Sequence, residues 1–198
     1  MKTRLLLILL SFSTISFAQF KPHIGMNWSL LSSEPQDYSK EGRAGFVIGA
    51  GFKFGESFYF EPGVQYSNLG TILINKADEN ISNQSYVQTI RIPVVGGFDF
   101  MDSDSPFNLR VFTGPSLSFV MGVNTENSAA ASAITPDGKE HYANTIWGWN
   151  IGAGMDILFV YVELSYELGM TDFYSTESPG FTGVKNNAVY ITAGVNLF

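Results

Sequence analysis

The stretch Val160-Tyr161-Val162-Glu163-Leu164-Ser165-Tyr166-Glu167-Leu168 alternates between apolar and mainly polar residues along its whole length. Successive side chains of a β-strand point to opposite faces, so this alternation predicts a strand with one apolar and one polar face. Nine tilted residues are also about enough for a strand to cross a bilayer. The stretch therefore has the pattern of a transmembrane strand whose lipid side carries Val160, Val162, Leu164, Tyr166 and Leu168.

The same two-residue period recurs along the rest of the chain, in segments separated by turn-rich connections. Eight strands are predicted, over residues 20–31, 43–54, 58–69, 86–100, 107–121, 146–157, 159–168 and 187–198. Strands can span a bilayer only as a closed sheet, because every backbone N–H and C=O group needs a partner within the protein. The predicted fold is all-β: an eight-stranded antiparallel up-and-down transmembrane β-barrel with a side-chain-filled interior.

The predicted connections alternate in length. Those after the second, fourth and sixth strands are short, and the others are longer. In outer-membrane barrels the tight turns face the periplasm and the long loops face the outside. Both ends of the barrel segment are therefore predicted on the periplasmic side.

The first 18 residues have the pattern of a secretory signal peptide. Lys2 and Arg4 precede an apolar stretch, and Ser16-Phe17-Ala18 supplies the small residues of a cleavage site. The apolar stretch is shorter than the roughly 20 residues of a spanning helix. We therefore predict a cleaved signal peptide over residues 1–18, a barrel domain over residues 19–198, and export to the outer membrane.

The composition excludes several classes of function. The chain has no cysteine, so disulfides, thiolate catalysis and cysteine-ligated metals are excluded. Its net charge is −7, which argues against a nucleic-acid partner because such a protein needs a basic face. No cofactor is expected.

The predicted inward faces carry charged side chains of both signs. Because an eight-stranded barrel is just wide enough for side chains to fill, these charges must pair with one another. We interpret them as a structural network in the lumen, and a proton or ion path is the functional alternative. The predicted network consists of Lys53, Glu61, Arg91, Asp99, Arg110, Asp156, Glu163 and Glu167.

Aromatic residues cluster where the strand assignment places the two membrane interfaces, as expected for an outer-membrane barrel in contact with lipid. The predicted interface aromatics are Trp28, Trp147 and Trp149 on the loop side and Phe58, Phe100 and Phe198 on the turn side.

Catalytic and metal sites have weak support. The two histidines, His23 and His141, are predicted at opposite ends of the barrel, with His23 on the inner face. A dyad of His141 with Asp137 or Ser132, or a calcium site at Asp137 and Glu140, would rest on local spacing alone. No catalytic, cofactor-binding or metal residue is therefore assigned.

The order and spacing of several short motifs resemble the PorT-like outer-membrane β-barrel domain family common in Bacteroidota. The resemblance covers nearly the whole chain after the signal peptide, and it implies an outer-membrane barrel without catalytic residues, in some members linked to secretion machinery or gliding. The last strand departs from the usual pattern, in which apolar or aromatic residues stand at alternate positions back from a terminal Phe. Here Asn196 and Gly194 stand at the positions alternate to Phe198, and the apolar residues Leu197 and Val195 stand between them. A bulge, or a strand that ends before Phe198, would explain the difference. The motifs are Lys21-Pro22-His23-Ile24-Gly25-Met26-Asn27, Gly45-Phe46-Val47-Ile48-Gly49, Phe60-Glu61-Pro62-Gly63-Val64-Gln65-Tyr66-Ser67, Ile92-Pro93, Gly114-Pro115-Ser116-Leu117, Gly152-Ala153-Gly154-Met155 and Glu163-Leu164-Ser165-Tyr166-Glu167-Leu168-Gly169.

The leading hypothesis is a non-enzymatic outer-membrane protein with a filled lumen, acting in envelope integrity, surface interaction or support of secretion machinery. Its expected partners are outer-membrane lipid and other envelope or secretion proteins. One alternative is a soluble secreted binder of lipocalin type, in which the apolar faces would point inward around a lipophilic ligand. A second is an outer-membrane hydrolase.

Overall fold

A computed structural model gives the arrangement of the chain and describes residues 18–32, 38–75, 82–101, 105–127, 142–174 and 183–197. Within these ranges no helix has the length and apolar character needed to cross a membrane. The predicted signal peptide lies outside the described residues except for Ala18, where the first strand begins. The strands are β1 (Ala18–Leu31), β2 (Tyr38–Gly55), β3 (Phe58–Asn75), β4 (Ser82–Asp99), β5 (Phe107–Asn127), β6 (Thr145–Ile157), β7 (Val160–Gly169) and β8 (Asn186–Val195).

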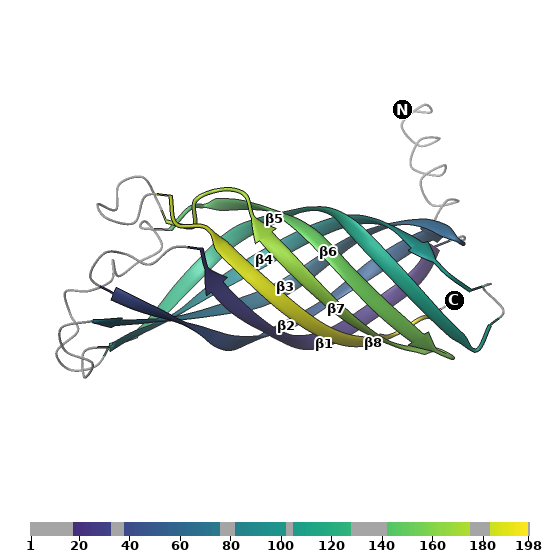
Figure 1. Ribbon diagram of the computed structural model, residues 1–198, viewed down its shortest axis with the longest axis horizontal. Coiled ribbons are helices and arrows are strands. Elements are labelled where there is room, and N and C mark those ends of the chain that lie inside the picture. Colours follow the sequence, from purple (N-terminus) through teal and green to yellow (C-terminus); the bar gives the residue numbers. More distant parts are fainter. Residues whose placement is uncertain are drawn as a thin grey trace, which may run out of the picture.

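The eight strands form a closed antiparallel barrel (Figure 1). Each strand pairs with the next along the chain, and β8 closes the sheet on β1 with a register that runs from His23↔Gly194 to Leu31↔Asn186. The predicted fold class is confirmed. Closure gives every strand two neighbours, which is what the backbone requires in lipid.

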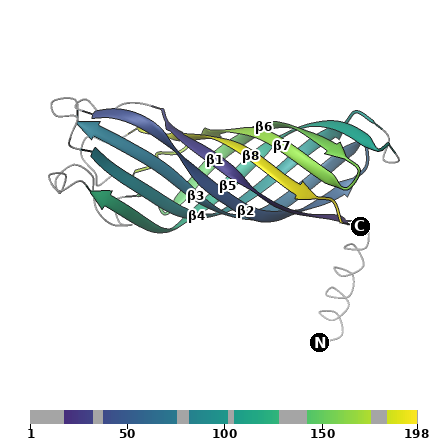
Figure 2. The ribbon, with the colours of Figure 1, turned by 90° about the horizontal axis from the view of Figure 1, so that it is seen from below.

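The short turns gather at one end of the barrel, called the turn end here, and the long connections at the outer end (Figure 1 and Figure 2). Gly55 adopts a φ of +105° between β2 and β3, and Leu158 adopts a φ of 57° between β6 and β7. Phe20 and Leu197 exchange two backbone hydrogen bonds of 2.9 and 2.8 Å at the turn end. The first and last strands therefore begin and finish on the same side.

Four strands are longer than the sequence pattern predicts, all of them at the outer end. Residues 38–42, 70–75, 82–85 and 122–127, which were predicted as connections, belong to β2, β3, β4 and β5. In a membrane barrel, the two-residue apolar period arises where one face of a strand meets lipid and the other the interior. Beyond the lipid this contrast disappears, so the pattern stops before the hydrogen-bonded strands do.

The last strand keeps its register through the described residues. The pair Phe20↔Leu197 continues the ladder that contains His23↔Gly194, so this part of β8 contains no bulge. Ile191 and Leu197 are exposed on the outside, whereas Asn196 points inward and donates to Asp156. Phe198 lies outside the described residues.

The outward faces are apolar. The outward side chains of β7 from Val160 to Leu168 are 36 to 55% exposed. Charged residues are absent from the outward positions of β1, β6, β7 and β8, the strands described at every residue. The lipocalin-like alternative is therefore wrong, because it requires the apolar faces to point inward.

Candidate functional site: the barrel interior

The inner wall carries charges of both signs at positions that alternation directs inward. All eight residues of the predicted lumen network lie on this wall. Lys21 on β1 also belongs to it and is fully buried, although the sequence analysis did not include it. Lys21 and His23 are two residues apart and so share one face of the strand. The predicted inward position of His23 therefore also implied an inward Lys21. With Lys21 the described lumen holds four cations and five carboxylates, namely Lys21, Lys53, Arg91, Arg110, Glu61, Asp99, Asp156, Glu163 and Glu167.

Five of these residues form a chain of alternating charge. Arg110 on β5 contacts both carboxylate oxygens of Asp156 on β6, each at 2.6 Å, and its other terminal nitrogen contacts Glu163 on β7 at 2.6 Å. Lys21 then joins Glu163 at 3.1 Å to Glu61 on β3 at 2.7 Å. The chain crosses the lumen and links five strands, so it braces the barrel from within.

Arg91 is the centre of a second cluster. Its Nε donates to Glu167 at 2.5 Å, and its two terminal nitrogens donate to Gln65 and Asn150. Ser116 donates to the same oxygen of Glu167 at 2.8 Å. All the nitrogens of a buried guanidinium are therefore satisfied, which is the condition for burying it without a large penalty.

Lys53 and Asp99 form a third pair near the turn end. The Lys53 ammonium donates to Asp99 and lies 4.6 Å from the ring centre of Tyr59. The side chains of this pair are 10% and 7% exposed. This pair is separate from the two larger clusters, so it offers a simple test of what one buried pair contributes.

His23 lies between the two larger clusters. Arginine can only donate hydrogen bonds, so the side-chain oxygen of Gln65 must accept the bond from Arg91. The amide nitrogen of Gln65 then points toward His23. That nitrogen lies 3.0 Å from Nε2 of His23, which must therefore accept. The remaining ring nitrogen, Nδ1, carries the proton and faces the Lys21 carbonyl and the Tyr161 hydroxyl, each at 3.2 Å. The network holds His23 as one neutral tautomer.

An apolar plug fills the barrel toward the outer end. The side chains of Tyr142, Phe173, Tyr174 and Val184, from the connecting segments, are 0 to 3% exposed. Ring centres of Tyr142 and Phe173 are 5.5 Å apart in an edge-to-face contact, and the backbone of Phe173 bonds to Ala143 and Val184. These residues lie outside the period-two segments, so the sequence pattern did not predict their burial. They pack on the wall residues Leu31, Val47, Leu69, Val87, Val120, Ile146, Ala188 and Tyr190.

The space left inside is small. A cavity of about 40 Å³ lies among His23, Glu61, Gln65, Arg91 and Glu163. A water molecule needs roughly 10 to 15 Å³ on this measure, so the cavity has room for a few waters bridging polar groups. It is too small for an organic ligand, whose pockets are typically above about 300 Å³.

The predicted interface aromatics lie on the outside where they are described. Trp147 and Trp149 on β6 are 49% and 40% exposed, and Phe58 and Phe100 at the turn end are 79% and 58% exposed. Trp28 on β1 is half-buried. The barrel thus has exposed aromatic side chains near both ends of its apolar band, as membrane barrels do.

A family model described as "Outer membrane protein beta-barrel domain" matches residues 11–175. The chain belongs to this outer-membrane β-barrel family. No curated protein matches the chain. Among solved structures, the barrel resembles OprG from Pseudomonas aeruginosa, with a TM-score of 0.54 and 10% identity over 90% of this chain and 93% of OprG. At this identity the likeness concerns the fold alone.

Two further solved structures give lower TM-scores. The Ail protein of Yersinia pestis, solved in complex with the heparin analogue sucrose octasulfate, gives a TM-score of 0.47 and 14% identity over 91% of this chain and 99% of Ail. Neisserial surface protein A gives a TM-score of 0.46 and 18% identity over 90% of this chain and 96% of that protein.

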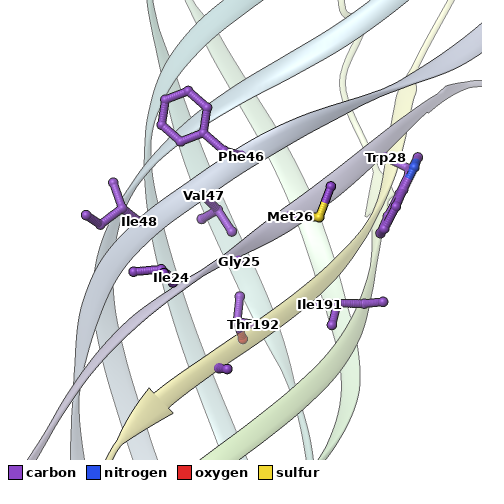
Figure 3. Close-up of a pocket in the computed structure, with 10 residues that line it drawn as sticks. Ile24, Gly25, Met26, Trp28, Phe46, Val47, Ile48, Ile191 and Thr192 are labelled. Atoms are coloured by element: carbon purple, nitrogen blue, oxygen red, sulfur yellow. The ribbon is translucent and has the colours of Figure 1, made fainter.

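The outer-membrane barrel also has an apolar hollow on its lipid-facing side. Figure 3 shows the side chains that line this hollow on three neighbouring strands, namely Ile24, Met26 and Trp28 of β1, Phe46 and Ile48 of β2 and Ile191 of β8. Its volume is about 610 Å³, and it lies over positions with little side chain, Gly25 and Ala193. Acyl chains of the surrounding membrane fit such a surface.

Of the remaining residues weighed for chemistry in this outer-membrane barrel, only His23 belongs to the described part of the chain. His23 is buried in the lumen, whereas Ser132, Asp137, Glu140 and His141 lie outside the described residues. In the part of the chain that the structure describes, no three His, Cys, Asp or Glu side chains are grouped as metal ligands.

Proposed function

We propose that this outer-membrane barrel is a non-enzymatic anchor with a filled lumen, whose exposed ends serve surface interaction, envelope integrity or the support of secretion machinery. The observation that carries the proposal is the filling of the interior. Ion pairs occupy the lumen toward the turn end, and the apolar plug occupies it toward the outer end. A protein that keeps its membrane interior closed offers its partners the two ends of the barrel.

Transport through the lumen is disfavoured on energetic grounds. Breaking one buried ion pair costs roughly 3 to 5 kcal/mol, because the remaining partner is left uncompensated. An open path would require breaking several of these pairs and displacing the plug. Catalysis is disfavoured because both ring nitrogens of His23 are engaged within the network.

Planar-bilayer recordings test the closed lumen. The purified barrel, inserted at verified density, is expected to give no stable conductance, while a porin added to the same bilayer gives steps. Reproducible conductance steps from the wild-type barrel would contradict a filled lumen and favour the ion path.

Two finer assignments belong to the same proposal. The motif order from Lys21 to Gly169 supports membership of the PorT-like branch found in Bacteroidota, and the pattern of residues 1–18 supports a cleaved signal peptide. Amino-terminal sequencing of the protein from outer-membrane fractions is expected to begin at Gln19. A mature chain that retains Met1, or that begins well inside β1, would contradict the assigned cleavage site.

A further inference from the structure

The apolar hollow on the lipid-facing side runs along β1 toward the outer end (Figure 3). Ile24, Met26 and Trp28 follow one another on the outward face of β1, so Trp28 is the outermost of the three. Phe46 of β2 and Ile191 of β8 line the hollow on either side of β1. Hydrocarbon chains of the bilayer cover an outward apolar surface of this kind, so a chain in the hollow places its headgroup beyond Trp28.

Lys185 faces outward beyond Trp28, on the β8 side of the hollow. Asn186 and Ala188 are 4% and 1% exposed and point inward, so alternation directs Lys185 outward. Ser32, which follows β1, donates to the Lys185 carbonyl at 2.7 Å, and its hydroxyl accepts from the Lys185 N–H at 2.9 Å. These bonds fix the backbone of Lys185 beside the outer end of β1.

The spacing between the hollow and Lys185 suits a lipid headgroup. Trp28 pairs with Val189, and Lys185 lies four residues further toward the outer end. At about 3.3 Å per residue and a strand tilt near 40°, four residues correspond to roughly 10 Å along the membrane normal. The headgroup layer occupies about the first 5 to 8 Å beyond the hydrocarbon, and the flexible lysine side chain can bridge the difference.

The ammonium group of Lys185 has no hydrogen-bond or ion-pair partner among the described residues, because all the hydrogen bonds of Lys185 there come from its backbone. Asp172 is its neighbour across an isolated backbone bridge. The Asp172 carboxylate accepts from the Gly183 N–H at 3.2 Å and forms no ion pair with Lys185. Lys185 is therefore the donor that can serve an anion from outside the described chain.

A second cation, Arg43, faces outward on the β2 side of the hollow. Its guanidinium lies 4.5 Å from the ring centre of Tyr86. Tyr86 points outward, because the next residue, Val87, is fully buried in the core. Arg43 directly precedes Ala44, which pairs with Trp28. Arg43 therefore adds positive charge to the outer surface at the level of Trp28.

A bulge brings Arg43 to this face. Val47 is 1% exposed and points inward, so strict alternation would direct Arg43 inward as well. The register of β2 with β3 shifts between these two residues, where β2 has one residue more than β3. Bulges of this kind re-aim side chains. Arg43 and Lys185 thus flank the outer end of the hollow, one on each side of β1.

We propose that this surface binds one membrane lipid with an anionic, phosphorylated headgroup. An acyl chain occupies the hollow, and a phosphate oxygen accepts a charge-assisted hydrogen bond from the Lys185 ammonium. Arg43 stays on Tyr86 and adds its positive field to the headgroup region. The inference goes beyond the proposed role of the barrel ends, because it assigns a site on the wall of the barrel.

The charges of the surface favour a lipid over a second copy of the chain. An anionic lipid presents an apolar chain and a negative headgroup in the same order as the hollow and the two cations. A second barrel would have to bring an anion to the same level. Its outward positions on β1, β6, β7 and β8 carry no charged residue. A phosphorylated lipid is therefore the better occupant.

Quenching of tryptophan fluorescence by brominated lipids tests the site. Bromine on an acyl chain quenches a tryptophan that the chain contacts, and Trp28 lines the hollow. The chain has three tryptophans, so Trp147→Phe and Trp149→Phe leave Trp28 as the only reporter. The full-length barrel is placed in phosphatidylcholine vesicles with increasing fractions of brominated phosphatidylglycerol or of brominated phosphatidylcholine. Both lipids carry a phosphate, but the choline cation neutralises it in the second, so the two differ in net charge.

The expected result is about threefold stronger binding of phosphatidylglycerol than of phosphatidylcholine at Trp28, which is the size expected of an exposed ion pair. Lys185→Gln should abolish this preference, and Lys185→Arg should keep it, because arginine also donates to phosphate. Both changes concern a side chain without partners among the described residues, so the barrel should still fold. Equal binding of the two lipids, or an unchanged preference in Lys185→Gln, would overturn the proposal.

A reporter on the far wall of the barrel is the matched control. Phe119 is exposed on β5, four strands away from β1 in the closed sheet. Phe119→Trp, in a chain whose three native tryptophans are replaced by phenylalanine, should show no preference for phosphatidylglycerol. An equal preference at both reporters would overturn a specific site, because the whole barrel would then attract anionic lipid.

Inorganic phosphate separates a lipid site from a site for the free ion. Millimolar phosphate at constant ionic strength should leave the preference at Trp28 unchanged, because a chain in the hollow holds the headgroup in place. Loss of the preference would overturn the proposal, since Lys185 would then take phosphate without a chain. Conductance of the lumen has no influence on these measurements, so the closed lumen is tested separately.

Discussion

The guanidinium of Arg110 and the carboxylate of Glu163 meet across the lumen, with Nη2 donating to Oε1 at 2.6 Å. Their strands, β5 and β7, are not neighbours, since β6 lies between them. The same oxygen of Glu163 accepts from Lys21 at 3.1 Å. One carboxylate therefore compensates two buried cations that lie on different sides of the barrel.

Replacing Glu163 by glutamine should strongly destabilise the barrel, because Arg110 and Lys21 each lose one of the two carboxylates that compensate them. We expect the free energy of unfolding to fall by about 3 to 5 kcal/mol. Reversible urea unfolding in lipid vesicles, followed by tryptophan fluorescence, measures it. Ser165→Ala, on the same face of β7, is the control and should cost less than about 1 kcal/mol. A loss for Glu163→Gln no larger than that of the control would show that the pairs do not brace the lumen.

The Lys53–Asp99 pair allows a double-mutant cycle. Lys53→Met and Asp99→Asn should each destabilise the barrel, because each leaves one buried partner uncompensated. The double variant should recover about 1 to 3 kcal/mol relative to the sum of the single changes. The same urea unfolding provides all four values. Simple additivity would mean that the two side chains do not interact in the lumen.

Substitutions of Phe173 test whether the apolar plug is tightly packed. Its side chain is fully buried between Tyr142 and Tyr174, so Phe173→Ala should leave a cavity and cost about 3 to 5 kcal/mol. Phe173→Leu keeps most of the volume and should cost clearly less. Protease cleavage of the outer connections of folded barrels in vesicles reports the loosening directly. Equal cleavage of both variants and wild type would contradict a packed plug.

The plug should also respond to alkaline pH. Burial, with a smaller contribution from the neighbouring Tyr142, raises the pKa of the Tyr174 phenol above its usual value near 10. A folded-state pKa above the unfolded one stabilises the fold fully below about pH 10, and this stabilisation is lost as pH rises through the folded-state pKa. We expect tyrosinate absorbance and protease sensitivity of the outer connections to rise together above pH 10. Tyr174→Phe should reduce that pH-dependent part, and an unchanged profile would argue against a buried phenol.

The sequence predicted the parts of the fold that lipid determines. In β7 the residues alternate from Val160 to Leu168 because one face meets lipid and the other meets a polar lumen. Both the strand and the direction of its two faces were therefore predictable. The outer ends of β2 to β5 were not, because residues such as Ser39 and Glu126 lie beyond that contrast, where backbone pairing alone defines the strand.

The interior was predictable as a set of inward charges but not as a set of contacts. Parity directs Arg110 and Glu163 inward, whereas their meeting depends on the register of three strands, which no local pattern contains. Lys21 was overlooked despite its inward parity. Tyr142 and Phe173 were not predictable as plug residues because their burial arises from contacts between distant connecting segments.

Cysteine scanning of β7 tests the central claim most directly, since the absence of native cysteine makes every introduced thiol unique. Spin labels placed in turn at each residue from Val160 to Leu168 in lipid vesicles report collision with oxygen, which concentrates in lipid, and with a water-soluble nickel chelate. We expect strong oxygen collision and little nickel collision at Val160, Val162, Leu164, Tyr166 and Leu168, and little of either at the intervening residues. Nickel collision dominating at the apolar positions, or no two-residue period at all, would contradict a barrel whose outer face meets lipid.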